Sequence, residues 1–233
     1  MDNVKRRRIR FYHVVFLIFL MAGTGYILNK NSQNSIWHES SGKIFGTFYN
    51  VKYQLNHSLD SSILETLEMV DASLSMFNPH SVVSQVNANL TSDVDSLFKE
   101  VFLLSTDVSN QTEGCFDVTV APLVNLWGFG FDRFEEVREH HVDSLLEFVG
   151  YKKVNLYGSQ IFKSHASTQL DFSAVAKGYG VDCVARTLER EGVSNYLVNI
   201  GGEIVAKGKS SVGKPWVVGI EIPDEDSLSS GTH

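Results

Sequence analysis

The spacing of apolar residues predicts four helices. In residues 59–76, apolar side chains recur at helical intervals and acidic ones fill positions between them, until an Asn-Pro pair ends the helix. The apolar positions of this helix are Leu59, Ile63, Leu67, Val70 and Leu74. Similar patterns predict helices over about residues 93–109, 133–150 and 174–191, and the last two end at a glycine.

Segments rich in aromatic and β-branched residues, bounded by turn residues, predict the strands. We expect strands at residues 46–55, within 152–164 on either side of a Gly-Ser turn, at 168–171, and at 195–200 and 216–222 around the Gly201-Gly202 turn. Strands and helices interleave, but several strands follow one another as hairpins. This order predicts an α+β fold with mixed, largely antiparallel sheets and packed helices, not a parallel βαβ fold.

The N-terminal 30 residues have the pattern of a membrane-targeting segment. The basic sequence KRRRIR precedes 18 residues without a formal charge, Phe11 to Leu28. Such a run predicts a membrane anchor with the basic end in the cytoplasm, and a signal peptide cut after residues 22–25 is the alternative. Residues 31–43 are rich in Ser and Asn and predict a polar linker, so that residues 44–233 form the folded domain on the far side of the membrane.

The charge of the remaining chain is acidic. Residues 1–30 hold six of the 20 basic residues and one of the 27 acidic residues, which leaves residues 31–233 with a formal net charge of −12. Nucleic-acid-binding domains usually carry the opposite charge, so this composition argues against a nucleic-acid partner.

The stretch DFSAVAKGYGVD, residues 171–182, carries the first candidate for chemistry. It opens a predicted helix, and the free N–H groups of a helix N-terminus, helped by Lys177, can hold a phosphate. Asp171 would repel a bare phosphate, but it suits sugar hydroxyls, an adenine amine or a nearby metal. The alternative is a purely structural helix cap by Asp171 or Ser173.

A second candidate is GCFDVTVAPLVNLWGFG, residues 114–130. Its mixture of Pro, Asn, Trp and Gly suits a rigid loop that presents backbone groups to a planar ligand, with Phe116 and Asp117 at the entrance. The alternative is a connection in which Trp127 and Phe129 fill the core.

Other motifs carry weaker signals. The sequence GEIVAKGKS is not a phosphate-binding P-loop, because five residues instead of four separate its glycines and no helix follows. Glu136 and His140 have the spacing of a metal-binding pair on a helix, but they lie on its polar face, which favours a solvent-exposed surface. Cys115 and Cys183 have no metal-ligand spacing and predict two buried thiols, with a disulfide as the alternative in an exported protein.

Six segments in chain order resemble one family, the FAD:protein FMN transferases or ApbE-like flavin transferases. They are GTFYNV (46–51), VDASLSMFNPHSVVSQVN (70–87), FDVTVAPLVNLWGFG (116–130), LDFSAVAKGYGVD (170–182), YLVNIGGEIVAKG (196–208) and WVVGIEIP (216–223). The resemblance covers nearly all of residues 44–223, and PLVNLWGFG, AKGY and VNIGG are its most specific motifs.

The resemblance implies an Mg²⁺-dependent enzyme that transfers FMN from FAD to a Thr or Ser hydroxyl of a partner flavoprotein and releases AMP. The family is exported and often membrane-attached, which implies a bacterial inner-membrane anchor, a periplasmic body and a membrane protein as flavin acceptor. Two alternatives remain open: a membrane-tethered FAD-binding protein without turnover, and an FAD pyrophosphate hydrolase.

By position, the resemblance implies contacts to FAD from seven residues and one metal contact. The FAD contacts are Phe45, Phe77, Cys115, Phe116, Asp117, Asp171 and Lys177. Asp171 is expected beside the adenosine part, and the Ala174 carbonyl is expected on Mg²⁺. No residue is assigned as a general base.

The sequence departs from the family pattern at several positions. Phe45 stands where Met is usual, Phe77 where Tyr is usual, and Ala121 where Gly is usual. Relatives continue beyond the last residue of this chain with the Asp and Thr side chains that ligate Mg²⁺. We therefore expect either a fragment of a working enzyme or a truncated copy without turnover.

Overall fold

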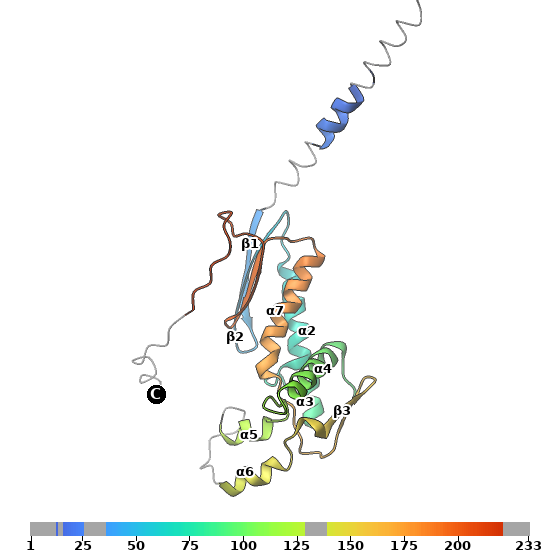
Figure 1. Cartoon of the computed structure of the whole chain (residues 1–233), viewed down its shortest axis with the longest axis vertical. Coiled ribbons are helices and arrows are strands. Elements are labelled where there is room, and N and C mark those ends of the chain that lie inside the picture. The colour runs from blue at the N-terminus through green and yellow to red at the C-terminus, as the bar shows by residue number, and fades with distance from the viewer. Residues whose placement is uncertain (1–12, 14–15, 26–35, 129–138, 221–233) are drawn as a thin grey trace, which may run out of the picture.

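A four-stranded antiparallel sheet covered by two long helices forms the larger part of the fold (Figure 1). The computed structural model describes residues 13, 16–25, 36–128 and 139–220. The sheet has the order β1-β2-β5-β6. Its strands are β1 (Ile36–Ile44), β2 (Thr47–Leu55), β5 (Tyr196–Ile200) and β6 (Glu203–Lys207). The α+β prediction with antiparallel sheets is therefore confirmed.

Helices α2 (Asp60–Leu74) and α7 (Ser173–Arg190) pack beside each other against this sheet (Figure 1). Their apolar faces bury a core cluster together with side chains of β2 and β5. Ile63 and Leu67 of α2 are fully buried, as the helical spacing predicts. Inside this core, the hydroxyls of Thr66 on α2 and Thr187 on α7 form a hydrogen bond of 3.0 Å.

A second core cluster lies at the other end of α2 and α7 (Figure 1). It joins α3 (Val82–Asn87) and α4 (Ser96–Gln111) to the hairpin of β3 (Val154–Tyr157) and β4 (Gln160–Lys163). A short 3-10 helix, Tyr151–Lys153, precedes the hairpin. Two further short helices are α5 (Ala121–Leu126) and α6 (Glu139–Leu146).

Strand β1 corrects the predicted polar linker. Residues 36–44 pair over their whole length with β2, from Ile36 opposite Leu55 to Ile44 opposite Thr47. The prediction of a linker through residue 43 was wrong for residues 36–43. Backbone hydrogen bonds to β2 hold this segment in a strand, and its polar composition gives no sign of such pairing. The ring of Trp37 also packs edge-on against Trp216, at 5.8 Å between centroids.

Two predicted strands do not form in the residues that the structure describes. Residues 168–171 and 216–220 form no strand, although the backbone N–H of Asp171 bonds the carbonyl of Val118 at 2.7 Å. The Gly201-Gly202 turn instead joins β5 to β6, so the partner strand begins immediately after the turn. A hairpin register depends on turn geometry, which composition alone does not specify.

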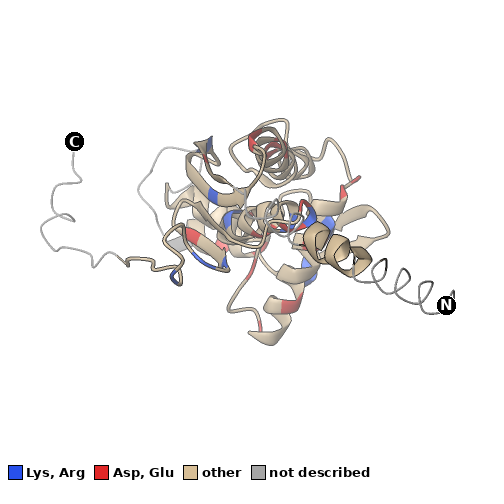
Figure 2. Cartoon of the chain, turned by 90° about the horizontal axis from the view of Figure 1, so that it is seen from above, with Lys and Arg blue, Asp and Glu red and all other residues tan. Residues whose placement is uncertain are grey.

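The targeting segment is described only in part. Residues 16–25 are helical (Figure 1), and no helix in the described part of the chain meets the length and hydropathy required to cross a bilayer. Most of the predicted Phe11–Leu28 run outside residues 16–25 lies beyond the described residues. Across the described residues, Lys and Arg are distributed over several separate elements (Figure 2), unlike the basic stripe of nucleic-acid-binding domains.

Candidate functional site

Six of the eight predicted site residues line one cavity of ≈ 510 Å³. They are Phe77, Cys115, Phe116, Asp117, Asp171 and Ala174. They come from three separate stretches: the segment after α2, the connection between α4 and α5, and the start of α7. The volume lies in the range of small-molecule sites.

The walls of this cavity are mainly apolar and suit a flat ring. Met76 and Phe116 are partly buried against the second core, which holds their side chains in place. Phe77 is 63% exposed at the edge of the cavity. An aromatic ring in such a position can stack on a planar ligand.

Asp117 organises the loop on one side of the cavity. Its Oδ1 accepts hydrogen bonds from the backbone N–H and the hydroxyl of Thr119, at 2.8 and 2.6 Å. Its Oδ2 accepts a hydrogen bond of 2.7 Å from the N–H of Tyr151. The hydroxyl oxygen of Thr119 in turn accepts from the N–H of Gly150 at 2.6 Å. These bonds fix the 117–119 segment against residues 150–151, so the Asp117 carboxylate holds the loop as well as facing the cavity.

Asp171 lies where the chain enters α7. Its Oδ1 accepts a hydrogen bond of 2.7 Å from the N–H of Ser173, the first residue of the helix. The N-cap position itself is Phe172, which makes no side-chain cap bond, so neither Asp171 nor Ser173 is the predicted N-cap. Asp171 also lines the cavity, so this hydrogen bond and a ligand contact are compatible.

Phe45 and Lys177 do not line this cavity. Phe45 has a positive φ of 52° and packs its ring between the two cores. The ammonium of Lys177 lies 3.7 Å from a carboxylate oxygen of Glu203, on the side of α7 that faces the β5–β6 turn. Their predicted contact with FAD stays a prediction.

Several lining residues were not predicted individually. Asn125 and Val124 belong to the PLVNLWGFG motif, whose residues 122–126 lie in helix α5 where the sequence predicted a rigid loop. The alternative for this motif was wrong as far as the structure describes it, because Trp127 is 51% exposed and does not fill the core. Phe129 and Glu136 lie outside the described residues. The side chain of His140 is likewise outside the description, which leaves the Glu136–His140 pair as a prediction.

The cysteines differ in environment. Cys183 is buried in α7, as predicted, and burial raises the pKa of its thiol. Cys115 is exposed at the cavity, so the prediction of a buried thiol was wrong for this residue. Both thiols are free, which does not support the disulfide alternative.

The described residues do not by themselves fit an Mg²⁺ ion. Among them there is no group of three or more His, Cys, Asp and Glu that could hold a metal. The acidic side chains at the cavity are Asp117 and Asp171, and both already accept bonds from backbone N–H groups. Mg²⁺ requires near-octahedral oxygen coordination, which these two carboxylates and the Ala174 carbonyl do not complete.

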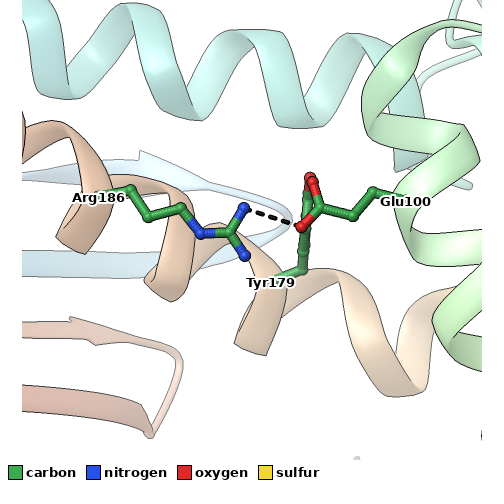
Figure 3. Close-up of polar contacts among 3 residues, drawn as sticks. All are labelled: Glu100, Tyr179 and Arg186. Carbon is green, nitrogen blue, oxygen red and sulfur yellow. Dashed lines mark hydrogen bonds and ion pairs between the residues drawn. The ribbon is translucent and has the colours of Figure 1, made fainter.

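A polar network away from the cavity residues joins α7 to α4 (Figure 3). The hydroxyl of Tyr179 donates a 2.6 Å hydrogen bond to Oε2 of Glu100, and Nη1 of Arg186 donates one of 2.9 Å to Oε1. The bond from Tyr179 lowers the pKa of Glu100, while burial and the Glu100 bond raise the pKa of Tyr179 well above its usual value. The network therefore ties the middle of α7 to α4, and α7 carries the cavity residue Ala174 on its first turn.

Comparison with known proteins places these features in one family. Residues 45–232 match the sequence model of the ApbE family. The chain is 36% identical over 200 residues to an FAD:protein FMN transferase of Vibrio cholerae, covering 81% of this chain and 60% of that protein. It is 37% identical over 201 residues to an FAD:protein FMN transferase of Haemophilus influenzae, covering 78% of this chain and 58% of the relative.

The fold is likewise similar to solved flavin transferases. The flavin transferase ApbE from Vibrio cholerae superposes with a TM-score of 0.75 at 33% identity, over 81% of this chain and 65% of that structure. The apo flavinyl transferase ApbE of Pseudomonas stutzeri gives a TM-score of 0.72 at 31% identity, over 80% and 66% of the two chains. The present chain spans 60% and 58% of the length of the two sequence relatives.

Proposed function

The chain belongs to the ApbE family, and we propose that it acts as a flavin transferase that moves FMN from FAD to a Thr or Ser hydroxyl of a partner protein. The observation that carries this proposal is the convergence of Phe77, Cys115, Phe116, Asp117, Asp171 and Ala174 on one cavity. These residues come from three stretches that are distant in the sequence, and a shared cavity allows them to contact one ligand.

The reaction is a displacement at phosphorus. The acceptor hydroxyl oxygen forms a bond to the FMN-side phosphorus of FAD, and the bond from that phosphorus to the bridging oxygen breaks. AMP leaves with the bridging oxygen, and the hydroxyl proton passes to solvent or to the departing phosphate. Catalysis of such a transfer depends mainly on positioning and on charge stabilisation.

The described residues contribute positioning. The apolar walls formed by Met76, Phe77 and Phe116 hold a planar ring, and Asp171 offers a carboxylate oxygen to a hydroxyl or amine of the adenosine part. The hydrogen bonds of Asp117 keep the opposite loop rigid. Mg²⁺ dependence is part of the proposal and rests on the resemblance alone, because the described residues do not complete an Mg²⁺ site.

The proposed location follows from the N-terminal sequence. The basic cluster before the Phe11–Leu28 run supports an anchor in a bacterial inner membrane, with the flavin transferase domain on the periplasmic side. A flavin acceptor of this enzyme is then a membrane protein that presents a Thr or Ser on the same side.

The test uses the full chain in detergent or vesicles with FAD, with and without MgCl₂. AMP and FMN are quantified by chromatography, and covalent flavin on added bacterial membrane proteins is detected by in-gel fluorescence. We expect Mg²⁺-dependent AMP release together with fluorescent acceptor bands. FMN and AMP without labelled protein would instead support the pyrophosphate hydrolase, and FAD binding that survives chelation without any product would support the tethered FAD-binding protein.

A matched pair of variants tests the cavity itself. Asp171→Asn keeps an oxygen that accepts from the N–H of Ser173 but removes the charge, and we expect FAD affinity to fall about 10-fold, corresponding to ~1.4 kcal/mol. Asp182→Asn makes the same change at an exposed position of α7 outside the cavity. Equal FAD affinity for both variants would contradict the assignment of Asp171.

A further inference from the structure

A second, larger cavity of ≈ 830 Å³ adjoins the proposed FAD site. Asn125 of α5 lines both cavities, so they meet at this side chain. The other walls come from the end of α3, from α6 and from the segment 166–169 that leads to Asp171. A group bound there lies next to the site at which FAD is expected.

The lining of this cavity is neutral and rich in carboxamides. It includes Asn87, Asn89, Asn125 and Gln169, together with apolar side chains such as Pro122, and none of its described lining residues is charged. Without a cation, such a lining does not suit the diphosphate of FAD. A neutral ligand with alternating donors and acceptors suits it better.

The four carboxamides divide into two pairs. Asn87 bonds the N–H and the carbonyl of Leu170, and Asn89 donates to the carbonyl of Ala166, so both hold the protein's own backbone. The side chains of Asn125 and Gln169 make no hydrogen bond to any part of the chain that the structure describes. Each can therefore offer one acceptor and two donors to a ligand.

A peptide unit has the matching groups. It presents one N–H donor and one C=O acceptor, and an extended segment exposes these groups along its length. The acceptor hydroxyl must also reach the phosphorus of FAD, so the segment that carries it must lie beside the nucleotide cavity. The shared position of Asn125 meets this requirement.

We propose that the amide-lined cavity receives an extended segment of the flavin-acceptor protein, whose backbone is bound by the carboxamides of Asn125 and Gln169. This inference rests on the proposed flavin transfer, because it assigns the second substrate of that same site. It predicts that recognition depends on backbone N–H groups of the acceptor next to the modified Thr or Ser.

The test compares thiol protection in the two cavities of the full chain. Native Cys115 reports on the FAD cavity, the thiol introduced by Gln169→Cys reports on the amide-lined cavity, and Gln111→Cys at the exposed end of α4 serves as control. Maleimide labelling is mapped by mass spectrometry with FAD alone and with a pool of short synthetic peptides that carry a central Thr. A second pool has the same sequences with N-methylated backbones, which lack N–H donors.

We expect FAD to protect Cys115 only, and the unmodified peptides to protect the thiol introduced by Gln169→Cys. In the chain with native Gln169, the N-methylated pool should bind at least about 5-fold more weakly, the effect of losing one hydrogen bond. Protection at position 169 by FAD alone, or equal binding of both peptide pools, would overturn the inference.

Failure of the proposed function gives a different result. If the chain does not bind FAD, then FAD leaves the labelling of Cys115 unchanged, and if it binds FAD without turnover, then FAD protects Cys115 but no AMP is released, whatever the peptides do at position 169. Gln169→Ala adds a kinetic test in the transfer reaction, with an expected rise of about 5-fold in the KM for peptide at saturating FAD. Gln111→Ala removes a carboxamide from the surface and should leave this KM unchanged; an unchanged KM in Gln169→Ala would also overturn the inference.

Discussion

The side chain of Asn87 fixes the segment that delivers Asp171 to the cavity, and its removal is the most direct test of how the site is built. Its Nδ2 donates a hydrogen bond of 2.8 Å to the carbonyl of Leu170, and its Oδ1 accepts one of 2.7 Å from the N–H of the same residue. Leu170 is fully buried and directly precedes Asp171. Asn87→Ala therefore leaves two backbone groups without their partner.

The expected cost follows from these two bonds. A buried donor or acceptor left unpaired costs about 1–3 kcal/mol, which gives about 2–6 kcal/mol for the pair. Asn87 also lines the larger cavity, so water can reach the unpaired N–H and carbonyl of Leu170 and reduce this loss of stability. We expect Asn87→Ala to lower the free energy of unfolding by about 3 kcal/mol.

Asn87→Asp tests the donor role of the Asn87 side chain separately from its acceptor role. The introduced carboxylate still accepts a hydrogen bond from the N–H of Leu170. Its second oxygen replaces the amide donor and faces the Leu170 carbonyl oxygen, so two acceptors meet without a donor and the variant should be destabilised at neutral pH. Protonation of the introduced carboxyl restores a donor, and the difference from the native chain should therefore shrink as the pH falls.

The assay is urea unfolding followed by circular dichroism, with direct measurement of FAD affinity on the folded variants. Asn110→Ala, at an exposed position near the end of α4, is the control and should change the unfolding free energy by less than about 0.5 kcal/mol. We expect the Asn87 variants to lose FAD affinity as well, because Asp171 is no longer held in place. A loss below about 0.5 kcal/mol for Asn87→Ala, or an Asn87→Asp variant unaffected by pH, would refute the reasoning.

Three further predictions concern other parts of the fold. The pKa of Tyr179 is raised by burial and by its hydrogen bond to Glu100, so the folded chain keeps the hydroxyl proton at a pH at which the unfolded chain loses it. The free energy of unfolding should therefore fall as the pH rises above the ordinary tyrosine pKa of 10.0. In thermal melts, Tyr179→Phe should reduce this fall. Gly180→Ala would place a Cβ 3.0 Å from the ring of Phe45, and we expect a loss of about 1–3 kcal/mol in urea unfolding, partly relieved by adding Phe45→Leu; an unchanged midpoint would contradict the close contact. A thiol reagent should modify Cys115 quickly in the native chain and the buried cysteine only on unfolding, so a count of two rapidly reacting thiols in the native state would contradict the observed burial.

The sequence was sufficient where a local pattern dictates the outcome. Helical spacing located α2 and α7, because a helix that buries one face must repeat apolar residues such as Ile63 and Leu67 at that period. The turn at Gly158-Ser159 located the β3–β4 hairpin. The resemblance to the family motifs identified the six residues that line the smaller cavity. It gave them as separate segments of the sequence and did not show that they lie together.

Tertiary contacts decided the rest. Residues 36–44 are too polar to predict a strand, and they form β1 because β2 offers an edge with matching hydrogen-bonding groups. The bonds of Asp117 to Thr119 and Tyr151, and the meeting of the two cavities at Asn125, join residues distant in the chain. A local pattern reflects the period of one helix or strand, whereas a cavity is the space left between elements once they pack, so its walls and its neighbours are determined only by the complete fold.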